Sequence, residues 1–526
     1  MSIRRLFAGV ATTSVVAASM ALIAPAHADP ATTPVAGDIV GVGSDTSMYA
    51  LSYLANGNAG VAGYNADKAA GSQLVSFDAK TVDAAGTQTN SATVVLRAGT
   101  AAVTRPNGST DGKKALYGAS NNVEVNYARS SSPLSTAESD AGLVAFPFAK
   151  DTLGMAVAQT TNAPTALTEA QIVDIYKGTI TNWSQVGGAA GVIVPLIPQP
   201  GSGTRSFFDA ELKRMNAGTT VVTAPSVKPV QEHDDSPIKG DPNAIAPFSV
   251  GRAGLLGTLR METGFSAARA LYNVVRQPDV SSAWAQGIFG PTGFVCSPAA
   301  TSLILDAGFE QLLSQANGGK CGVTTTSSTA VSDLLTAKVS TTTTVAGTSA
   351  TAGALALTAT VGGGGQLKPQ GTVAFSVDGA AKGNAIVTGG KAAFNLTGLT
   401  AGDHKVVATF TPTGAAFNGS ASAETVVNVK AVAPVATKLV EKFKASYPKA
   451  ASYKGKVLVK ETSTLAPTGK IIVKLGKKTV GKGTIKSGKV TLKLKKLKKG
   501  KNKLTATYAG DSAFNASKLK FKITVK

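Results

Sequence analysis

Short apolar runs rich in β-branched residues alternate with helix-like stretches between Asp38 and about Val323. The apolar runs predict strands at 93–96, 123–127, 155–158 and 192–197. Apolar residues spaced three and four positions apart predict helices at 48–54, 168–176, 204–214 and 302–313. Strands that alternate with helices along the chain are typical of α/β domains. We therefore expect residues 29–323 to form an α/β body.

The pattern changes at Thr324. A Thr/Ser-rich segment, 324–340, is expected to be an exposed linker with strand character. Beyond it apolar and polar residues alternate with period two between glycine turns, and one unit of this kind is followed by a second. Gly371-Thr-Val-Ala-Phe-Ser-Val aligns with Gly469-Lys-Ile-Ile-Val-Lys-Leu, about 98 positions later. We expect two all-β sandwiches, 341–430 and 431–526, which resemble bacterial immunoglobulin-like repeats of surface proteins.

The positive charge is concentrated in the second of these units. The chain has a net charge of +22, but the stretch from Lys430 to Lys526 holds 26 lysines against three acidic residues, and the remainder is close to neutral. Arginine is missing from this stretch, and its densest lysine run, 486–503, has no interleaved aromatic residue to stack on bases, so specific nucleic-acid binding is not expected. Two interpretations stay open. The lysines form either a solvated face that protects edge strands or a surface that adheres to an anionic cell-envelope polymer.

The first 28 residues have the pattern of a secretory signal peptide. Arg4 and Arg5 precede an apolar run, and Ala26-His27-Ala28 forms a small-x-small cleavage site. No cysteine follows that site to carry a lipid, and no later apolar stretch reaches the length of a membrane span. We expect a secreted or cell-surface protein that starts near Asp29.

Cysteine and histidine are scarce. In an oxidising compartment Cys296 and Cys321, the two cysteines of the chain, could form a disulfide; the alternative is a pair of buried thiols. Three histidines leave few candidates for a zinc site or for the base of a hydrolase triad. We therefore expect neither an enzyme nor a cofactor.

Four Gly/Ser/Thr-rich stretches lie where a predicted helix begins. They start at Gly43, Pro106, Arg129 and Pro200. Free backbone N–H groups at a helix start, together with nearby hydroxyls, can hold an oxyanion without a metal ion. A single stretch of this kind is usually only a turn with a helix cap, whereas four in one domain indicate an anion site.

Several ordered motifs resemble those of the phosphate-binding proteins of bacterial ABC transporters. They are Gly41-Val-Gly-Ser-Asp-Thr, Val125-Asn-Tyr-Ala-Arg-Ser-Ser-Ser-Pro-Leu, Leu167-Thr-Glu-Ala-Gln-Ile-Val-Asp-Ile-Tyr-Lys-Gly-Thr-Ile-Thr-Asn-Trp and Gly201-Ser-Gly-Thr. The resemblance spans roughly 38–323. It implies two α/β lobes that close on phosphate or a related oxyanion without covalent chemistry, and an ABC permease as a possible partner.

The resemblance also implies a set of binding residues. Ser202, Gly203 and Thr204 match the family's Gly-Ser-Gly-Thr loop, Ser109 matches a loop serine, and Ser44 to Thr46 match the first loop loosely. The expected ligand-binding set is Ser44, Asp45, Thr46, Ser109, Arg129, Ser130, Ser131, Ser202, Gly203, Thr204 and Arg205.

Two positions depart from the family pattern. Ser131 occupies the place of the family's cleft aspartate, and Pro198 the place of its arginine, so Arg129 or Arg205 would have to supply the positive charge. Asp45 could replace the missing acceptor or could merely cap helix 48–54. A serine does not require a proton on the ligand, which leaves discrimination between phosphate and sulfate-like anions open. A surface adhesion or envelope-structural protein with a degenerate binding domain is the alternative.

Overall fold

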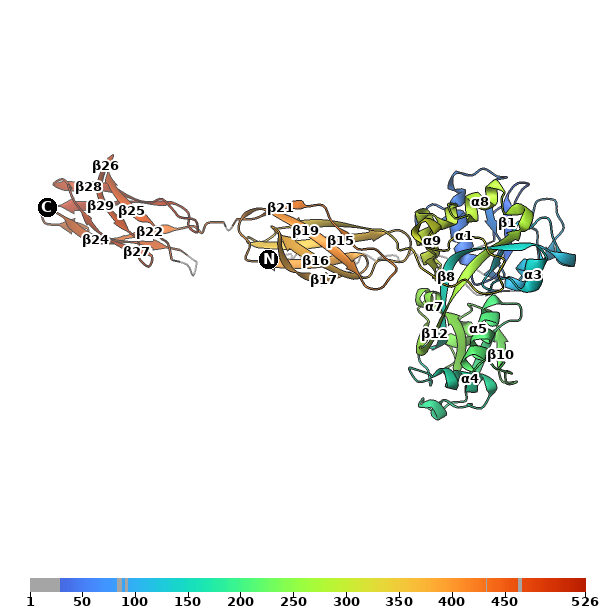
Figure 1. Ribbon diagram of the computed structural model, residues 1–526. Helices are drawn as coiled ribbons and strands as arrows, with labels where there is room; N and C mark the ends of the chain where they lie inside the picture. The colour runs from blue at the N-terminus through green and yellow to red at the C-terminus, as the bar shows by residue number, and fades with distance from the viewer. Residues whose placement is uncertain (1–28, 83–87, 90–92, 432, 462–465) are drawn as a thin grey trace, which may run out of the picture. The chain divides into compact units, whose positions relative to one another are not determined.

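The computed structural model describes residues 29–82, 88–89, 93–431, 433–461 and 466–526 (Figure 1). The predicted signal peptide lies outside these residues. The described residues form two compact units: those up to 342, with 362–370 and 412–419, form the first, and those within 343–361, 371–411 and 420–526 form the second. The α/β body lies in the first unit and most of both β repeats in the second, so we describe the body and each repeat separately.

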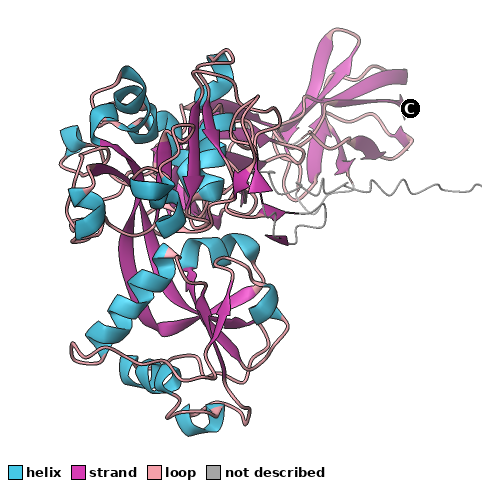
Figure 2. Cartoon of the chain, turned by 90° about the vertical axis from the view of Figure 1, so that its right-hand side faces the viewer, coloured by secondary structure: helices cyan, strands magenta, loops and turns pink. Residues whose placement is uncertain are grey.

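Two long antiparallel strands, β8 (Leu143–Ala158) and β12 (Leu259–Arg276), run through the whole α/β body. They are the central pair of a sheet with the order β10-β9-β11-β8-β12-β7-β1-β2. The flanking strands are β1 (Ile39–Gly43), β2 (Leu74–Ser76), β7 (Tyr127–Ser130), β9 (Val194–Pro198), β10 (Lys228–Val230) and β11 (Ala244–Ser249). Strands β7, β1 and β2 belong to a first lobe and β11, β9 and β10 to a second, with β8 and β12 shared between them (Figures 1 and 2).

Each lobe has its own buried core, covered by helices. Helices α1 (Met48–Asn56), α8 (Ala283–Phe289) and α9 (Thr301–Asp306) pack in the first lobe. Helices α4 (Glu169–Lys177) and α5 (Gly203–Met215) pack in the second. Helix α4 starts at a capping box of Thr168 and Gln171, which satisfies two free N–H groups, and this explains why its start was predictable.

No single helix of the described residues is long and apolar enough to cross a membrane. One bent pair of helical segments, Ala283–Cys296 with Pro298–Asp306, has the required length and composition. Its apolar side chains, including Phe289 and Leu303, belong to the buried core of the first lobe.

The structure corrects two predicted elements. The strand expected at 123–127 is found at 127–130, because β7 pairs with β1 from Tyr127 onward. The helix expected at 302–313 ends at Asp306. Gly308 then adopts a φ of 94°, and Glu310–Gln311 form a short strand, β13, that pairs with β8. The apolar spacing of 302–313 therefore mixes a helix with a strand.

The predicted linker makes defined contacts with the α/β body. The backbones of Thr325 and Ala145 exchange hydrogen bonds of 2.9 Å, and the Val331 amide donates to the hydroxyl of Tyr272 at 3.1 Å.

Cys296 and Cys321 form a disulfide, as one of the two interpretations predicted.

Each β repeat contains a three-stranded and a five-stranded sheet. The first repeat has β14 (Thr341–Thr348), β15 (Ala354–Gly363), β16 (Gly371–Val377), β17 (Ala380–Ile386), β18 (Lys391–Thr397), β19 (Gly402–Pro412), β20 (Ser420–Ala421) and β21 (Thr425–Val429). The second has β22 (Lys438–Lys442), β23 (Ser446–Tyr447), β24 (Tyr453–Lys460), β25 (Lys470–Leu475), β26 (Lys478–Thr484), β27 (Lys489–Leu494), β28 (Gly500–Tyr508) and β29 (Ser517–Val525). Buried and exposed residues alternate along most strands, so each repeat has its own apolar core. The predicted fold class, an α/β body followed by all-β repeats, is confirmed.

Candidate functional site

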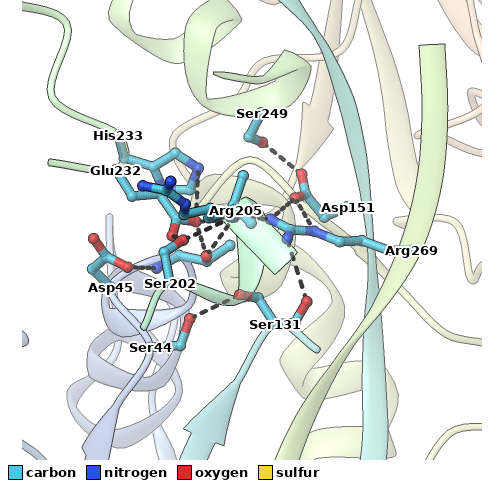
Figure 3. Close-up of polar contacts among 12 residues, drawn as sticks. Ser44, Asp45, Ser131, Asp151, Ser202, Arg205, Glu232, His233, Ser249 and Arg269 are labelled. Carbon is cyan, nitrogen blue, oxygen red and sulfur yellow. Dashed lines mark hydrogen bonds and ion pairs between the residues drawn. The ribbon is translucent and has the colours of Figure 1, made fainter. Parts of the chain in front are cut away.

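Hydroxyl side chains from both lobes meet at one place in the α/β body (Figure 3). Each belongs to a segment where a strand ends or a helix begins, and each is at most 1% exposed. The first lobe supplies Ser44, Thr46, Ser109 and Ser131, and the second lobe supplies Ser202 and Thr204 at the start of α5. We call these six residues the hydroxyl cradle.

Several cradle hydroxyls hydrogen-bond to one another. Ser131 Oγ lies 3.2 Å from both Ser44 Oγ and Ser109 Oγ. Thr46 Oγ1 of the first lobe also lies 3.3 Å from Thr204 Oγ1 of the second, although both hydroxyls direct their protons elsewhere. Gly203 fits between the lobes because it has no side chain: a Cβ there would lie 2.4 Å from Ser131 Oγ and 2.5 Å from Ser109 Oγ.

The carboxylate of Glu232 is bound by this cradle. Thr46, Ser202 and Thr204 each donate a hydroxyl hydrogen bond to it. Glu232 follows β10 in the second lobe, and its side chain is 1% exposed. Three of the six cradle hydroxyls thus hold a carboxylate of the same chain.

The positive charge beside the cradle comes from Arg269. Its guanidinium donates to Thr204 Oγ1 and lies 3.7 Å from Glu232 Oε1. Two further bonds of 2.8 and 3.0 Å join it to Asp151 Oδ2, and Ser249 Oγ donates to Asp151 Oδ1 at 2.6 Å. Arg269 and Asp151 lie opposite each other on β12 and β8, where the shared strands pass from one lobe to the other.

Asp45 is the second buried carboxyl group of the site. Its Oδ2 accepts from the side-chain amides of Gln231 and, at 3.2 Å, of Gln199, both from the second lobe. Burial raises the pKa of Asp45 well above its usual range, and the nearby charge of Glu232 adds to the shift. The N-cap residue of helix α1 is Ser47, so Asp45 is not its cap.

The pKa of Glu232 is lowered despite its burial. Burial by itself raises it, but His233, Arg269 and the hydroxyls of Ser202 and Thr204 together outweigh that effect. His233 packs on Phe248, neither of its ring nitrogens has a hydrogen-bond partner, and burial lowers its pKa to about 4. Because His233 is therefore neutral near pH 7, Arg269 and the hydroxyls are what keep Glu232 ionised there.

Three residues of the predicted set face other groups. Arg129 is fully buried and donates to the carbonyl oxygens of Gly43 and Ser44 and to Ser76 Oγ, so it supports the first loop. Arg205 donates to the Pro198 carbonyl at 3.1 Å, and Ser130 Oγ donates to the Ser132 carbonyl at 2.7 Å.

Sequence reasoning missed Glu232, Arg269 and Asp151. A charged residue inside an apolar strand, as in Ala268-Arg269-Ala270, was the available signal for Arg269. No comparable signal marks Glu232.

Among the described residues no group of three His, Cys, Asp or Glu side chains is arranged to hold a metal ion.

Comparisons with known proteins agree with this architecture. Residues 68–271 match the family model described as "PBP superfamily domain", and residues 444–526 match "Bacterial Ig-like domain (group 3)". No curated protein matches the chain.

Several solved structures are similar to parts of the chain. An ABC-type phosphate transport receptor from Vibrio cholerae is 21% identical over 52% of this chain and 98% of its own, with a TM-score of 0.35. PstS from Borrelia burgdorferi is 19% identical over 53% and 98%, with a TM-score of 0.32. The fibronectin(III)-like modules of CbhA from Clostridium thermocellum are 17% identical over 35% and 94%, with a TM-score of 0.16.

The first family match includes most of the site, with Ser109, Ser131, Ser202, Glu232 and Arg269, whereas Ser44 to Thr46 precede it. Residues 68–271 of this chain are therefore similar to a PBP superfamily domain, and residues 444–526 to a bacterial Ig-like domain.

Proposed function

We propose that the α/β body captures phosphate or a related small oxyanion between its lobes, without covalent chemistry. The observation that carries this proposal is the hydroxyl cradle, in which six buried hydroxyls from two lobes converge beside the guanidinium of Arg269. The start of the 13-residue helix α5 adds backbone N–H groups that favour negative charge. The carboxylate of Glu232 is itself an oxyanion with three hydroxyl bonds, and we expect an external ligand to use the same donors.

Calorimetric titration of the mature chain with phosphate and sulfate tests this proposal. We expect one site per chain, and the double variant Ser202→Ala/Thr204→Ala should lose at least 100-fold in affinity because two buried donors are removed. Thr219→Ala, an exposed hydroxyl in the same lobe, should bind as the unchanged protein does. Absence of heat and of thermal stabilisation with every small oxyanion would refute the proposal.

Export and delivery to an ABC permease are the use that we propose for this capture. The predicted signal peptide supports export, and PBP-like and Ig-like domains both suit an extracellular or periplasmic location. Deletion of the protein from its host should then lower uptake of the bound anion. Unchanged uptake would restrict the proposal to binding alone.

We also propose that the second β repeat holds the protein on an anionic envelope polymer. On the three-stranded sheet β22-β24-β27, lysines face each other across the strands in three pairs: Lys438 with Lys460, Lys442 with Lys456, and Lys454 with Lys493. Like charges directly opposite each other destabilise a sheet, and no lysine in 433–461 or 466–526 forms an ion pair. A polyanion laid on this face would relieve the repulsion, so we expect a linear phosphodiester polymer as the partner.

The alternative function, an adhesion or envelope-structural protein, is favoured by one observation. The carboxylate of Glu232 already uses the hydroxyl donors of Thr46 and Ser202, so these donors are not free for an external anion. If no small anion bound while envelope attachment persisted, this alternative would replace oxyanion capture.

A further inference from the structure

We infer that Glu232 acts as an internal anion: its carboxylate occupies the ligand's place in the cradle, and an incoming oxyanion has to displace it. This inference rests on the proposed function and adds the residue that sets which anions can bind. Glu232 lies in neither the predicted binding set nor any of the sequence motifs that suggested it.

Glu232 uses hydroxyl donors that an external ligand would need. One oxygen of Glu232 accepts from Thr46 and Thr204, and the other accepts from Ser202. The remaining cradle hydroxyls, of Ser44, Ser109 and Ser131, bond to one another. An oxyanion that binds in the cradle therefore has to take donors that Glu232 now uses.

Glu232 and its neighbours also connect the two lobes. Glu232 belongs to the second lobe and Thr46 to the first, so their hydrogen bond crosses between lobes. Gln231, which precedes Glu232 in sequence, and Gln199, which contacts its backbone, cross in the same way to Asp45. The Glu232 amide donates to Gln199 Oε1 at 2.9 Å, which ties these contacts together. Glu232 thus makes, from one lobe to the other, the kind of contact that a bound anion would make.

The buried charges of the site oppose the binding of a second anion beside Glu232. Glu232 and Asp45 are both buried in the site, and Arg269 is already paired with Asp151. An added dianion beside an ionised Glu232 would meet repulsion in a region that excludes water. The ligand and the Glu232 carboxylate therefore bind in alternation. A tetrahedral dianion has more charge and more acceptor oxygens than a carboxylate, so it can displace Glu232 from the cradle donors. A monoanion such as nitrate or acetate binds these donors no better than Glu232 does, and so does not displace it.

Glu232→Gln tests the inference, because the amide has a similar shape without the charge. In calorimetry of the mature chain we expect phosphate to bind at least tenfold more tightly to this variant, and nitrate, which the unchanged protein ignores, to bind measurably. Glu169→Gln, an exposed carboxylate on α4 of the same lobe, is the matched control and should change neither affinity.

Lobe closure provides a second readout that does not depend on affinity. Spin labels on Val123→Cys in the first lobe and Val222→Cys in the second, both highly exposed positions, report the distance between lobes. Without ligand, the unchanged protein should be closed and Glu232→Gln should shift toward a longer distance that phosphate shortens again. Glu232→Asp, which keeps the charge on a shorter side chain, should lie between them.

The outcomes separate the two proposals. Weaker or unchanged phosphate binding by Glu232→Gln, with closure unaltered, would overturn the internal anion. If no oxyanion bound to either protein while Glu232→Gln opened the lobes, the proposed function would fail and the internal anion would stand. Binding of nitrate and phosphate by both proteins with equal affinity would also overturn it, since Glu232 would then exclude nothing.

Discussion

At the scale of single residues, the buried pair of Asp151 and Arg269 should matter most for stability. Asp151→Asn removes the carboxylate that accepts two hydrogen bonds from Arg269, in a site that excludes water and where the other carboxylate, of Glu232, lies 3.7 Å away. We expect the free energy of unfolding to fall by about 3 to 5 kcal/mol, measured by urea denaturation. The exposed pair of Glu169 and Arg214 is the comparison, and Glu169→Gln should cost less than about 1 kcal/mol. Equal losses from the two substitutions would contradict this ranking.

A second residue, His233, should make stability depend on pH. Burial lowers its pKa to about 4, against about 6.5 in an unfolded chain, so the unfolded state binds the proton more readily. The contribution of His233 is complete above pH 6.5 and is lost as the pH falls toward 4, by about 3 kcal/mol in all. His233→Asn has no ring to titrate and suits the φ of 59° at this position.

Urea unfolding of the two proteins at pH 7.5 and 4 measures this contribution. The unchanged protein should lose about 3 kcal/mol more than His233→Asn over that interval. The same loss in both proteins would assign the acid sensitivity to other groups.

At the scale of elements, the start of α5 controls how closely the lobes approach. Gly203→Ala suits the helix itself, because the backbone conformation there is ordinary and alanine favours helices. Its methyl group would, however, meet Ser131 Oγ and Ser109 Oγ of the first lobe. We expect this variant to open the lobes and to weaken anion binding by tenfold or more, as seen in label distances and calorimetry.

Gly287→Ala is the control for this substitution. It lies in helix α8, where a Cβ would meet no atom within 4 Å. It should raise the free energy of unfolding by about 0.4 to 1 kcal/mol and leave binding unchanged. Closed lobes with full affinity in Gly203→Ala would show that the first lobe can move away at little cost.

Elements also explain what could be predicted from sequence. Helices α4 and α5 were found because a cap precedes a regular apolar spacing in each. The cradle was found because Gly/Ser/Thr stretches mark the places where strands turn into helices. Arg269, Asp151 and Glu232 were missed because their roles depend on how β8 pairs with β12 and where the loop after β10 folds back. These are long-range contacts, and a single sequence does not encode them in any local pattern.

At the scale of the whole molecule, attachment to the envelope should depend on salt. Binding of the mature chain to immobilised poly(glycerol phosphate) should weaken about tenfold or more between 0.1 and 0.3 M salt, because exposed charges are screened and counterions are released. Replacing Lys438, Lys442, Lys456 and Lys460 by Gln should weaken binding at low salt to a similar extent.

The first β repeat supplies the control for this experiment. It has the same pairing of a three-stranded with a five-stranded sheet and four exposed lysines, at 382, 391, 405 and 430, whose replacement by Gln removes equal charge. We expect those changes to have little effect. Equal loss in both sets would mean that net charge alone drives binding, and retention at high salt would disprove an electrostatic tether. Stronger binding to DNA or to anionic vesicles than to the polymer would assign a different partner.

The shared contact of Glu232 with both lobes also has a consequence for rates. An anion in solution cannot reach Thr46, Ser202 or Thr204 until the lobes part and the carboxylate leaves, so opening precedes capture. Stopped-flow traces should then show an observed rate that rises with phosphate concentration and levels off at the opening rate. In Glu232→Gln this maximum rate should be higher, because opening of the lobes no longer includes the release of a charged side chain. The protein would thus bind its ligand more slowly, and in return its site would exclude the common monoanions around it.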